Sequence, residues 1–158
     1  VKFIHRGYYD HMEESKELLV SYGNEKIWDV LEKNLRNRVI VFGEQPEMLR
    51  FPCCTQSYTD IEGSGGNFNL SSSPEALADF FTFAEVDYIY LGSGYLKPGT
   101  DGFRNVTGLL KQGYLTDLLY ENGNGLAVFS SDPKNLTEEE SEALLAEFTE
   151  KYWPGEQQ

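Results

Sequence analysis

The chain has 158 residues, with 26 acidic residues against 13 basic ones, so its formal net charge is -13. Binding to a nucleic-acid backbone needs a basic surface, and this composition argues against nucleic acid as a partner. The 22 aromatic residues are enough to build a core, so we expect one folded domain over residues 1–154 and a disordered tail over residues 155–158. Because the sequence begins at Val1 rather than Met, we expect the domain to be excised from a longer protein.

Two helices and a strand are predicted in the first third of the chain. Asp10 and Glu13 have the spacing of a capping box and begin a helix that ends before Gly23. Apolar residues at helical spacing predict a second helix from about Glu25. The apolar run Arg38–Phe42 is short and rich in β-branched residues, which is typical of a strand covered on both faces.

The pattern is weaker between residues 44 and 73, where prolines and a glycine cluster interrupt any long element. We expect one short strand there, in either Thr55–Ile61 or Asn67–Leu70. The adjacent residues Cys53 and Cys54 are too close for an ordinary disulfide and lack the spacing of a metal site. They are therefore expected to be packed or unreactive thiols.

A helix followed by a strand is predicted next. Ser72 and Pro74 begin a helix that runs to about Ala84, and Val86–Leu91 forms the second clear strand. A helix between two such strands indicates a βαβ unit, so the strands at Arg38–Phe42 and Val86–Leu91 should be parallel.

The last third predicts a helix, a hairpin and a final helix. The helix spans Phe103–Gln112, and two strands, Leu115–Glu121 and Gly125–Ser131, flank a turn rich in Asn-Gly pairs. The final helix starts at Thr137, capped by Glu140, and ends at Pro154. The expected fold is a three-layer α/β sandwich with a short mixed, mainly parallel sheet, an antiparallel hairpin at its edge and a C-terminal helix.

The search for reactive groups finds no catalytic set, no metal site and no need for a cofactor. Gly92-Ser-Gly94 lacks the remaining pattern of a dinucleotide loop, and the two histidines, His5 and His11, lie far along the chain from any serine at a strand end. Ligands of open α/β sheets bind at the carboxyl ends of the strands, and an acidic group beside an aromatic ring suits a sugar. The candidate ligand-binding residues are therefore Glu44, Tyr58, Asp60, Glu62, Gly92, Ser93, Gly94 and Tyr95.

Four segments carry a resemblance to a known group of proteins. They are Arg38-Val-Ile-Val-Phe-Gly43, Val86-Asp-Tyr-Ile-Tyr-Leu-Gly92, Tyr114-Leu-Thr-Asp-Leu-Leu-Tyr-Glu-Asn-Gly123 and Leu126-Ala-Val-Phe129. In this order they resemble the soluble C-terminal domains of bacterial multi-pass membrane proteins related to GT-C glycosyltransferases, over about Ile27 to Ser131. The resemblance implies a location outside the cytoplasmic membrane and, in the parent protein, transfer of a lipid-linked sugar by residues that this chain lacks.

Three functions follow as alternatives. The first is a non-catalytic extracytoplasmic accessory or binding domain of a membrane-bound glycosyltransferase-like protein. Its partners would be the membrane-embedded remainder of the same polypeptide and possibly a glycan or a lipid-linked sugar. The second is a small stand-alone α/β enzyme, or a nucleotide- or sugar-binding protein, that uses the strand ends and could be cytoplasmic. The third is a structural interaction module.

Overall fold

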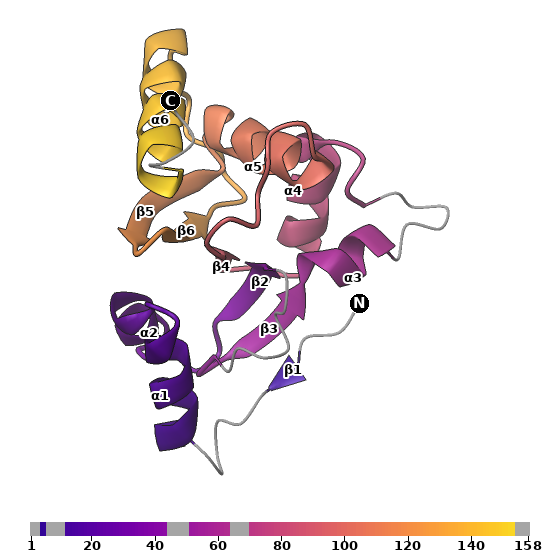
Figure 1. Ribbon diagram of the computed structural model, residues 1–158. Helices are drawn as coiled ribbons and strands as arrows, with labels where there is room; N and C mark the ends of the chain where they lie inside the picture. The colour runs from indigo at the N-terminus through magenta and orange to yellow at the C-terminus, as the bar shows by residue number, and fades with distance from the viewer. Residues whose placement is uncertain (1–3, 6–11, 44–50, 64–69, 154–158) are drawn as a thin grey trace.

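The computed structural model describes residues 4–5, 12–43, 51–63 and 70–153. Its helices and strands are interspersed along the chain (Figure 1). The strands are β1 (Ile4–His5), β2 (Arg38–Phe42), β3 (Cys54–Ser57), β4 (Tyr88–Leu91), β5 (Leu115–Glu121) and β6 (Asn124–Phe129). The helices are α1 (Met12–Ser21), α2 (Glu25–Leu31), α3 (Tyr58–Gly63), α4 (Pro74–Phe83), α5 (Asp101–Lys111) and α6 (Glu138–Tyr152).

The strands form one mixed sheet in the order β1-β3-β2-β4-β6-β5. The two pairs at its centre, β2 with β3 and β2 with β4, are parallel, and the other three pairs are antiparallel. Helices α1 and α2 lie on one side of the sheet, and α4, α5 and α6 lie on the other (Figure 1). The three-layer α/β sandwich is therefore confirmed.

Alternating side chains of β2 place a core on each face of the sheet. Val39 and Val41 pack with Trp28 of α2, whereas Ile40 and Phe42 pack with the residues of α4, α5 and α6. All of these side chains are at most 1% exposed. A strand buried on both faces cannot alternate between polar and apolar residues, which explains why the run Arg38–Phe42 is continuously apolar after its first residue.

The predicted parallel pairing of the two central strands is confirmed, but the prediction that the sheet is mainly parallel is wrong. Strands β2 and β4 are neighbours and parallel, with Ile40 opposite Ile89. The sheet is not mainly parallel, because the unpredicted strand β1 and the β5-β6 hairpin add antiparallel pairs at both edges. Residues 44–50, 64–69 and 154–158, which include Glu44, Asn67 and the expected tail, lie outside the described residues.

Short-range capping patterns locate two of the helix starts. Thr137 and Glu140 form a full capping box at α6, as their spacing predicts. At α4 the cap is Ser73 rather than Ser72, since the Ser73 hydroxyl accepts the backbone N–H of Ala76. Pro74 then occupies the first helical turn, where its missing N–H leaves no bond unmade.

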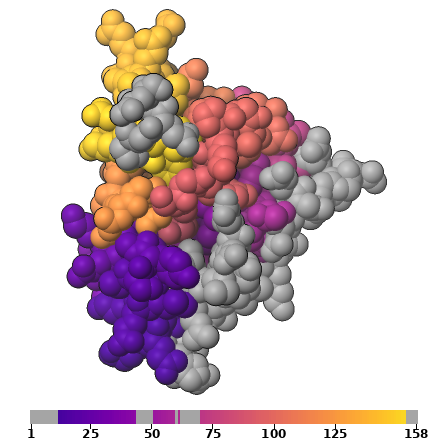
Figure 2. Space-filling model, viewed as in Figure 1, coloured from indigo at the N-terminus to yellow at the C-terminus, as the bar shows by residue number. Residues whose placement is uncertain are grey.

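The hairpin turn is also determined locally. Asn122 and Gly123 both have positive φ angles, 52° and 80°, as a tight two-residue turn between strands requires. The hairpin reaches the surface between the N-terminal helices and α6, where Figure 2 shows it in orange between indigo and yellow. Its tip therefore contacts α2 as well as the rest of the sheet.

A carboxylate at this tip caps a helix that is distant in sequence. Both carboxylate oxygens of Glu121 accept the backbone N–H of Lys26 at 3.0 Å, and one accepts that of Ile27 at 3.3 Å. Asn24, the residue before α2, makes no side-chain cap of its own. The negative charge of Glu121 also interacts favourably with the positive end of the α2 helix dipole.

We expect Glu121→Ala to lower the free energy of unfolding by about 1 kcal/mol, as the loss of a helix cap does elsewhere. Urea denaturation measures the change, and Glu121→Gln is the control because its amide oxygen keeps one acceptor. The cap would have no role in stability if the alanine and glutamine variants unfolded at the same urea concentration as the unmodified chain.

Candidate functional site

The carboxyl ends of the parallel strands bring the two predicted groups of ligand-binding residues to one edge of the sheet. Tyr58 directly follows β3, and Gly92 to Tyr95 directly follow β4. The hydroxyl oxygens of Thr59 and Tyr95 lie 3.4 Å apart across this edge. The structure therefore brings the start of α3 and the turn after β4 to the same edge of the sheet.

The backbone of the Gly92–Tyr95 turn is already engaged by other parts of the chain. The N–H of Ser93 donates to the side-chain oxygen of Asn124 at 2.8 Å. The carbonyl of Gly92 accepts the hydroxyl of Tyr152 and the N–H of Tyr95. An anion at this turn would have to displace bonds that hold β6 and α6 in place.

The aromatic member of the acid-and-aromatic group is a core residue. Tyr58 is 1% exposed, its ring stacks on Phe42 at 4.3 Å between centroids, and its hydroxyl accepts the side-chain amide of Asn105 at 3.0 Å. A ring buried in this way cannot serve as a stacking platform for a sugar. Asp60 and Glu62, the acidic members of the group, belong to helix α3.

A wide polar groove opens at the opposite edge of the sheet, and we call it the amino-edge groove. It has a volume of about 880 Å³ and lies where β2 and β4 begin and β6 ends. Most of its lining residues carry a hydrogen-bonding side chain. They are Asn34, Arg36, Arg38, Phe81, Thr82, Glu85, Val86, Asp87, Val128, Phe129, Ser130 and Ser131.

Hydrogen bonds and an ion pair connect the start of β2 to the segment between α4 and β4, and both line this groove. The guanidinium of Arg38 donates to the carbonyl of Ala84 at 2.7 Å and lies 3.8 Å from the carboxylate of Glu85. The N–H of Arg38 donates to the carboxylate of Asp87 at 2.9 Å. Glu85, which follows the C-cap residue Ala84 of α4, has a φ angle of 55°, in the left-handed region. The groove therefore presents donors and acceptors from a fixed framework.

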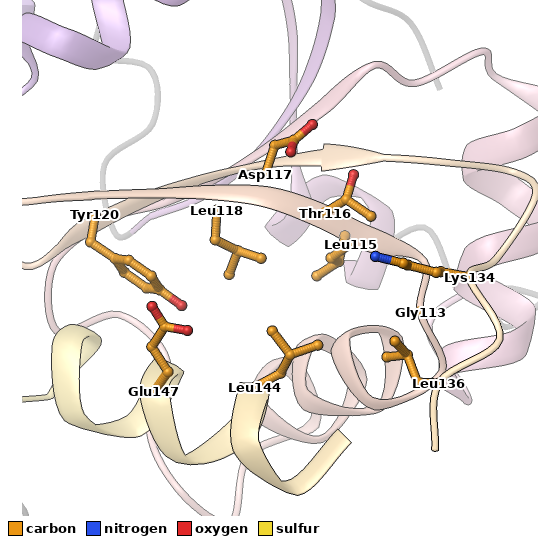
Figure 3. A pocket seen from close by; sticks show the side chains of 10 residues that line it. All are labelled: Gly113, Leu115, Thr116, Asp117, Leu118, Tyr120, Lys134, Leu136, Leu144 and Glu147. Atoms are coloured by element: carbon orange, nitrogen blue, oxygen red, sulfur yellow. The ribbon is translucent and has the colours of Figure 1, made fainter. Parts of the chain in front are cut away.

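A smaller cavity, which we call the β5-α6 slot, lies between the edge strand and the last helix. Its volume is about 180 Å³. In Figure 3 leucine side chains from the strand and from the helix face each other across the open space, with Lys134 at one end and Tyr120 and Glu147 at the other. The lining residues are Gly113, Leu115, Thr116, Asp117, Leu118, Tyr120, Lys134, Leu136, Leu144 and Glu147.

Two kinds of reactive group have their pKa raised by burial. Burial raises the pKa of Tyr120, and the carboxylate of Glu147, toward which its hydroxyl points in Figure 3, raises it further. Burial also raises the pKa of the Cys53 thiol to about 12, with smaller contributions from Cys54 and Asp87. The Cys53 thiol is free and buried. At neutral pH Cys53 is a buried thiol rather than a nucleophilic thiolate.

Other kinds of site were searched for in the same part of the chain. Among the described residues, no three His, Cys, Asp or Glu side chains are grouped so that they could hold a metal ion. In the same residues no helix combines the length and apolar character that would cross a bilayer.

Sequence reasoning missed both cavities. The amino-edge groove joins residues from three segments that are far apart in sequence, and no motif in any of them indicates that they meet. The sequence does contain one indication of the β5-α6 slot. Leu115, Leu118 and Tyr120 do not follow the two-residue period of a regular strand. This spacing indicates an inserted residue in β5.

Comparison of the chain with protein-family models, with characterised proteins and with solved structures gives no match. The resemblance to glycosyltransferase-related domains therefore stays a prediction from the strand patterns. The amino-edge groove and the β5-α6 slot are the features from which a function can be argued.

Proposed function

We propose that the chain is a non-catalytic binding module, the extracytoplasmic accessory domain of a membrane-bound glycosyltransferase-like protein. The amino-edge groove is the observation that carries the binding role. Its volume lies within the range of ligand sites, and its lining combines guanidinium, amide, hydroxyl and carboxylate groups. Such a mixture of donors and acceptors suits a polyhydroxylated ligand, so we assign a glycan to this groove.

The arrangement of the sheet supports the same proposal. At the carboxyl edge, where ligands of α/β enzymes bind, the turn after β4 is already bonded to Asn124 and Tyr152 of the chain itself. The open polar surface lies instead at the amino edge, on residues held by backbone bonds. The extracytoplasmic location and the membrane-embedded partner follow from the strand resemblance.

A saccharide titration followed by amide NMR tests the binding role. We expect oligosaccharides of two or three rings to shift the signals of groove residues, and Arg36→Ala to weaken binding about ten-fold, the effect of losing one charged hydrogen bond. Lys16→Ala is the matched control, because it removes the same charge from α1, which does not line the groove.

Two outcomes would contradict the proposal. One is a panel of saccharides that leaves the groove signals unmoved at millimolar concentration. The other is a set of shifts confined to Gly92–Tyr95, which would return the site to the carboxyl edge and favour the nucleotide- or sugar-binding enzyme instead.

A further inference from the structure

The β5-α6 slot is a permanent feature, because the helix is fixed on both sides of it. Near its start, the hydroxyl of Ser141 donates to the carbonyl of Lys111 at 2.8 Å. Near its end, Phe148 is fully buried and the Tyr152 hydroxyl donates to the carbonyl of Gly92. Leu144 lies between these attachments and lines the slot. The helix therefore cannot move onto β5 and close the space without breaking one of them.

A bulge in β5 directs apolar side chains into the slot. Thr116 pairs with Val128 and Leu119 with Leu126, so two residues, Asp117 and Leu118, stand opposite a single residue of β6. The extra residue shifts the alternation of the strand by one position. Leu118 and Tyr120 consequently lie on the same face as Leu115, on the side of α6.

The bulge also carries backbone strain. Asp117 has a φ angle of 48°, a conformation that costs a non-glycine residue about 1 kcal/mol or more. Strained residues and bulges in edge strands are concentrated at binding sites, where they redirect a side chain. In Figure 3 Asp117 points away from the leucines, so its carboxylate lies beyond the rim of the slot rather than in its floor.

The size and charge of the slot define what it can hold. A volume of about 180 Å³ corresponds to about six water molecules and is below the range of cofactor sites, so it suits one aliphatic side chain. The slot itself is lined by Lys134 at one end and Glu147 at the other, and the helix beside it is acidic, since α6 carries six glutamates and one lysine. That lysine, Lys151, lies 3.2 Å from Glu147 and 5.5 Å from the centre of the Tyr120 ring, so a partner's ammonium group would share Glu147 with Lys151 at this end of the slot.

We propose that the β5-α6 slot is a docking site for a basic segment of a partner protein, which inserts one aliphatic side chain between Leu118 and Leu144. Lysine or arginine residues beside that side chain face the acidic surface of α6, near Glu147. Charge complementarity selects the partner and accelerates its association, and burial of the aliphatic side chain provides the anchor. This docking is separate from saccharide binding at the amino-edge groove.

A peptide series tests the proposal on the unmodified chain. The probes are the acetylated and amidated peptides Lys-Lys-Leu-Lys-Lys, Lys-Lys-Ser-Lys-Lys and Glu-Glu-Leu-Glu-Glu, followed through leucine methyl signals. We expect the first to shift the methyl groups of Leu118 and Leu144. The serine peptide should bind at least ten-fold more weakly, since it cannot bury an aliphatic group, and the acidic peptide should not bind.

A pair of variants places the binding in the slot. Leu144→Phe fills the space from the helix and is expected to abolish binding of the leucine peptide. Leu145→Phe is the matched control, because it makes the same change at the next residue, which does not line the slot. Thermal melting of both variants checks that the fold is retained.

Several results would overturn the proposal. Equal affinity for the leucine and serine peptides would mean that only the acidic surface attracts them. Absence of binding by all three peptides at millimolar concentration, or binding that survives Leu144→Phe, would exclude the slot. Self-association of the chain that Leu144→Phe abolishes would make a second copy the occupant. None of these results bears on the saccharide titration.

Discussion

Replacing Gly113 with alanine is expected to remove a large share of the stability of this fold. Gly113 has a φ angle of 85°, and a Cβ atom there would lie 2.0 Å from the carbonyl oxygen of Lys134. The obstacle is backbone, and the N–H of Lys134 donates to the carbonyl of Gly113 at 3.0 Å, so the two segments cannot separate freely. The left-handed conformation and the steric overlap together predict a loss of about 3–5 kcal/mol.

Gly99→Ala is the matched control for this substitution. Gly99 has a similar φ angle of 89°, but a Cβ atom there would meet nothing within 4 Å. Gly99→Ala should therefore lower the free energy of unfolding only by the cost of the left-handed conformation, about 1–2 kcal/mol. Urea denaturation of the two variants separates backbone conformation from overlap, and equal losses would show that the contact with Lys134 does not constrain the fold.

The second large effect is a loss of stability at alkaline pH. Burial raises the pKa of Tyr90 and of Tyr152 to about 12 from an ordinary value of 10.0, and it raises the pKa of Cys53 to about 12 from 9.0. Below about pH 9 the folded and unfolded chains keep these protons, so the stability is full. Between pH 9 and 12 the unfolded chain loses protons that the folded chain retains, and the free energy of unfolding falls.

The expected size of this effect at pH 11 is several kcal/mol, since each of the two tyrosines contributes about 1 kcal/mol by that pH and Cys53 contributes about 3 kcal/mol. Urea denaturation at pH 7 and at pH 11 measures it. Tyr90→Phe removes one titrating group, so the difference between the two pH values should become smaller than in the unmodified chain. A free energy of unfolding that stays constant up to pH 11 would contradict the burial of these hydroxyl groups.

The parts of the fold that were predicted correctly depend on residues close together in sequence. The capping box of Thr137 and Glu140, the Asn122-Gly123 turn and the apolar strand at Val39 are each determined within a few positions. Local backbone geometry is sufficient for such signals, which is why the hairpin, the parallel pair and the described helices other than α3 could be located. The possible strand Thr55–Ile61 is wrong in its second half, because β3 ends at Ser57 and α3 begins at Tyr58.

The parts that were missed depend on pairings across the fold. Asn124 bonds to Ser93, which is 31 positions away, and Glu121 caps α2 from 95 positions away. No pattern of apolar residues selects such polar pairs, because they form only when the sheet has been assembled. The bonds that occupy the Gly92–Tyr95 turn and the framework of the amino-edge groove both result from contacts of this kind.

The attachment of α6 also has a consequence for the order in which the protein folds during synthesis. Since α6 follows β6 in the chain, the whole sheet leaves the ribosome before the helix that covers Leu115 and Phe129 and bonds to Gly92. A nascent chain at that stage exposes an apolar sheet face with an unpaired edge strand. Until α6 has docked, the part of the sheet that it covers and the edge strand β5 are surfaces through which the chain could pair with another copy.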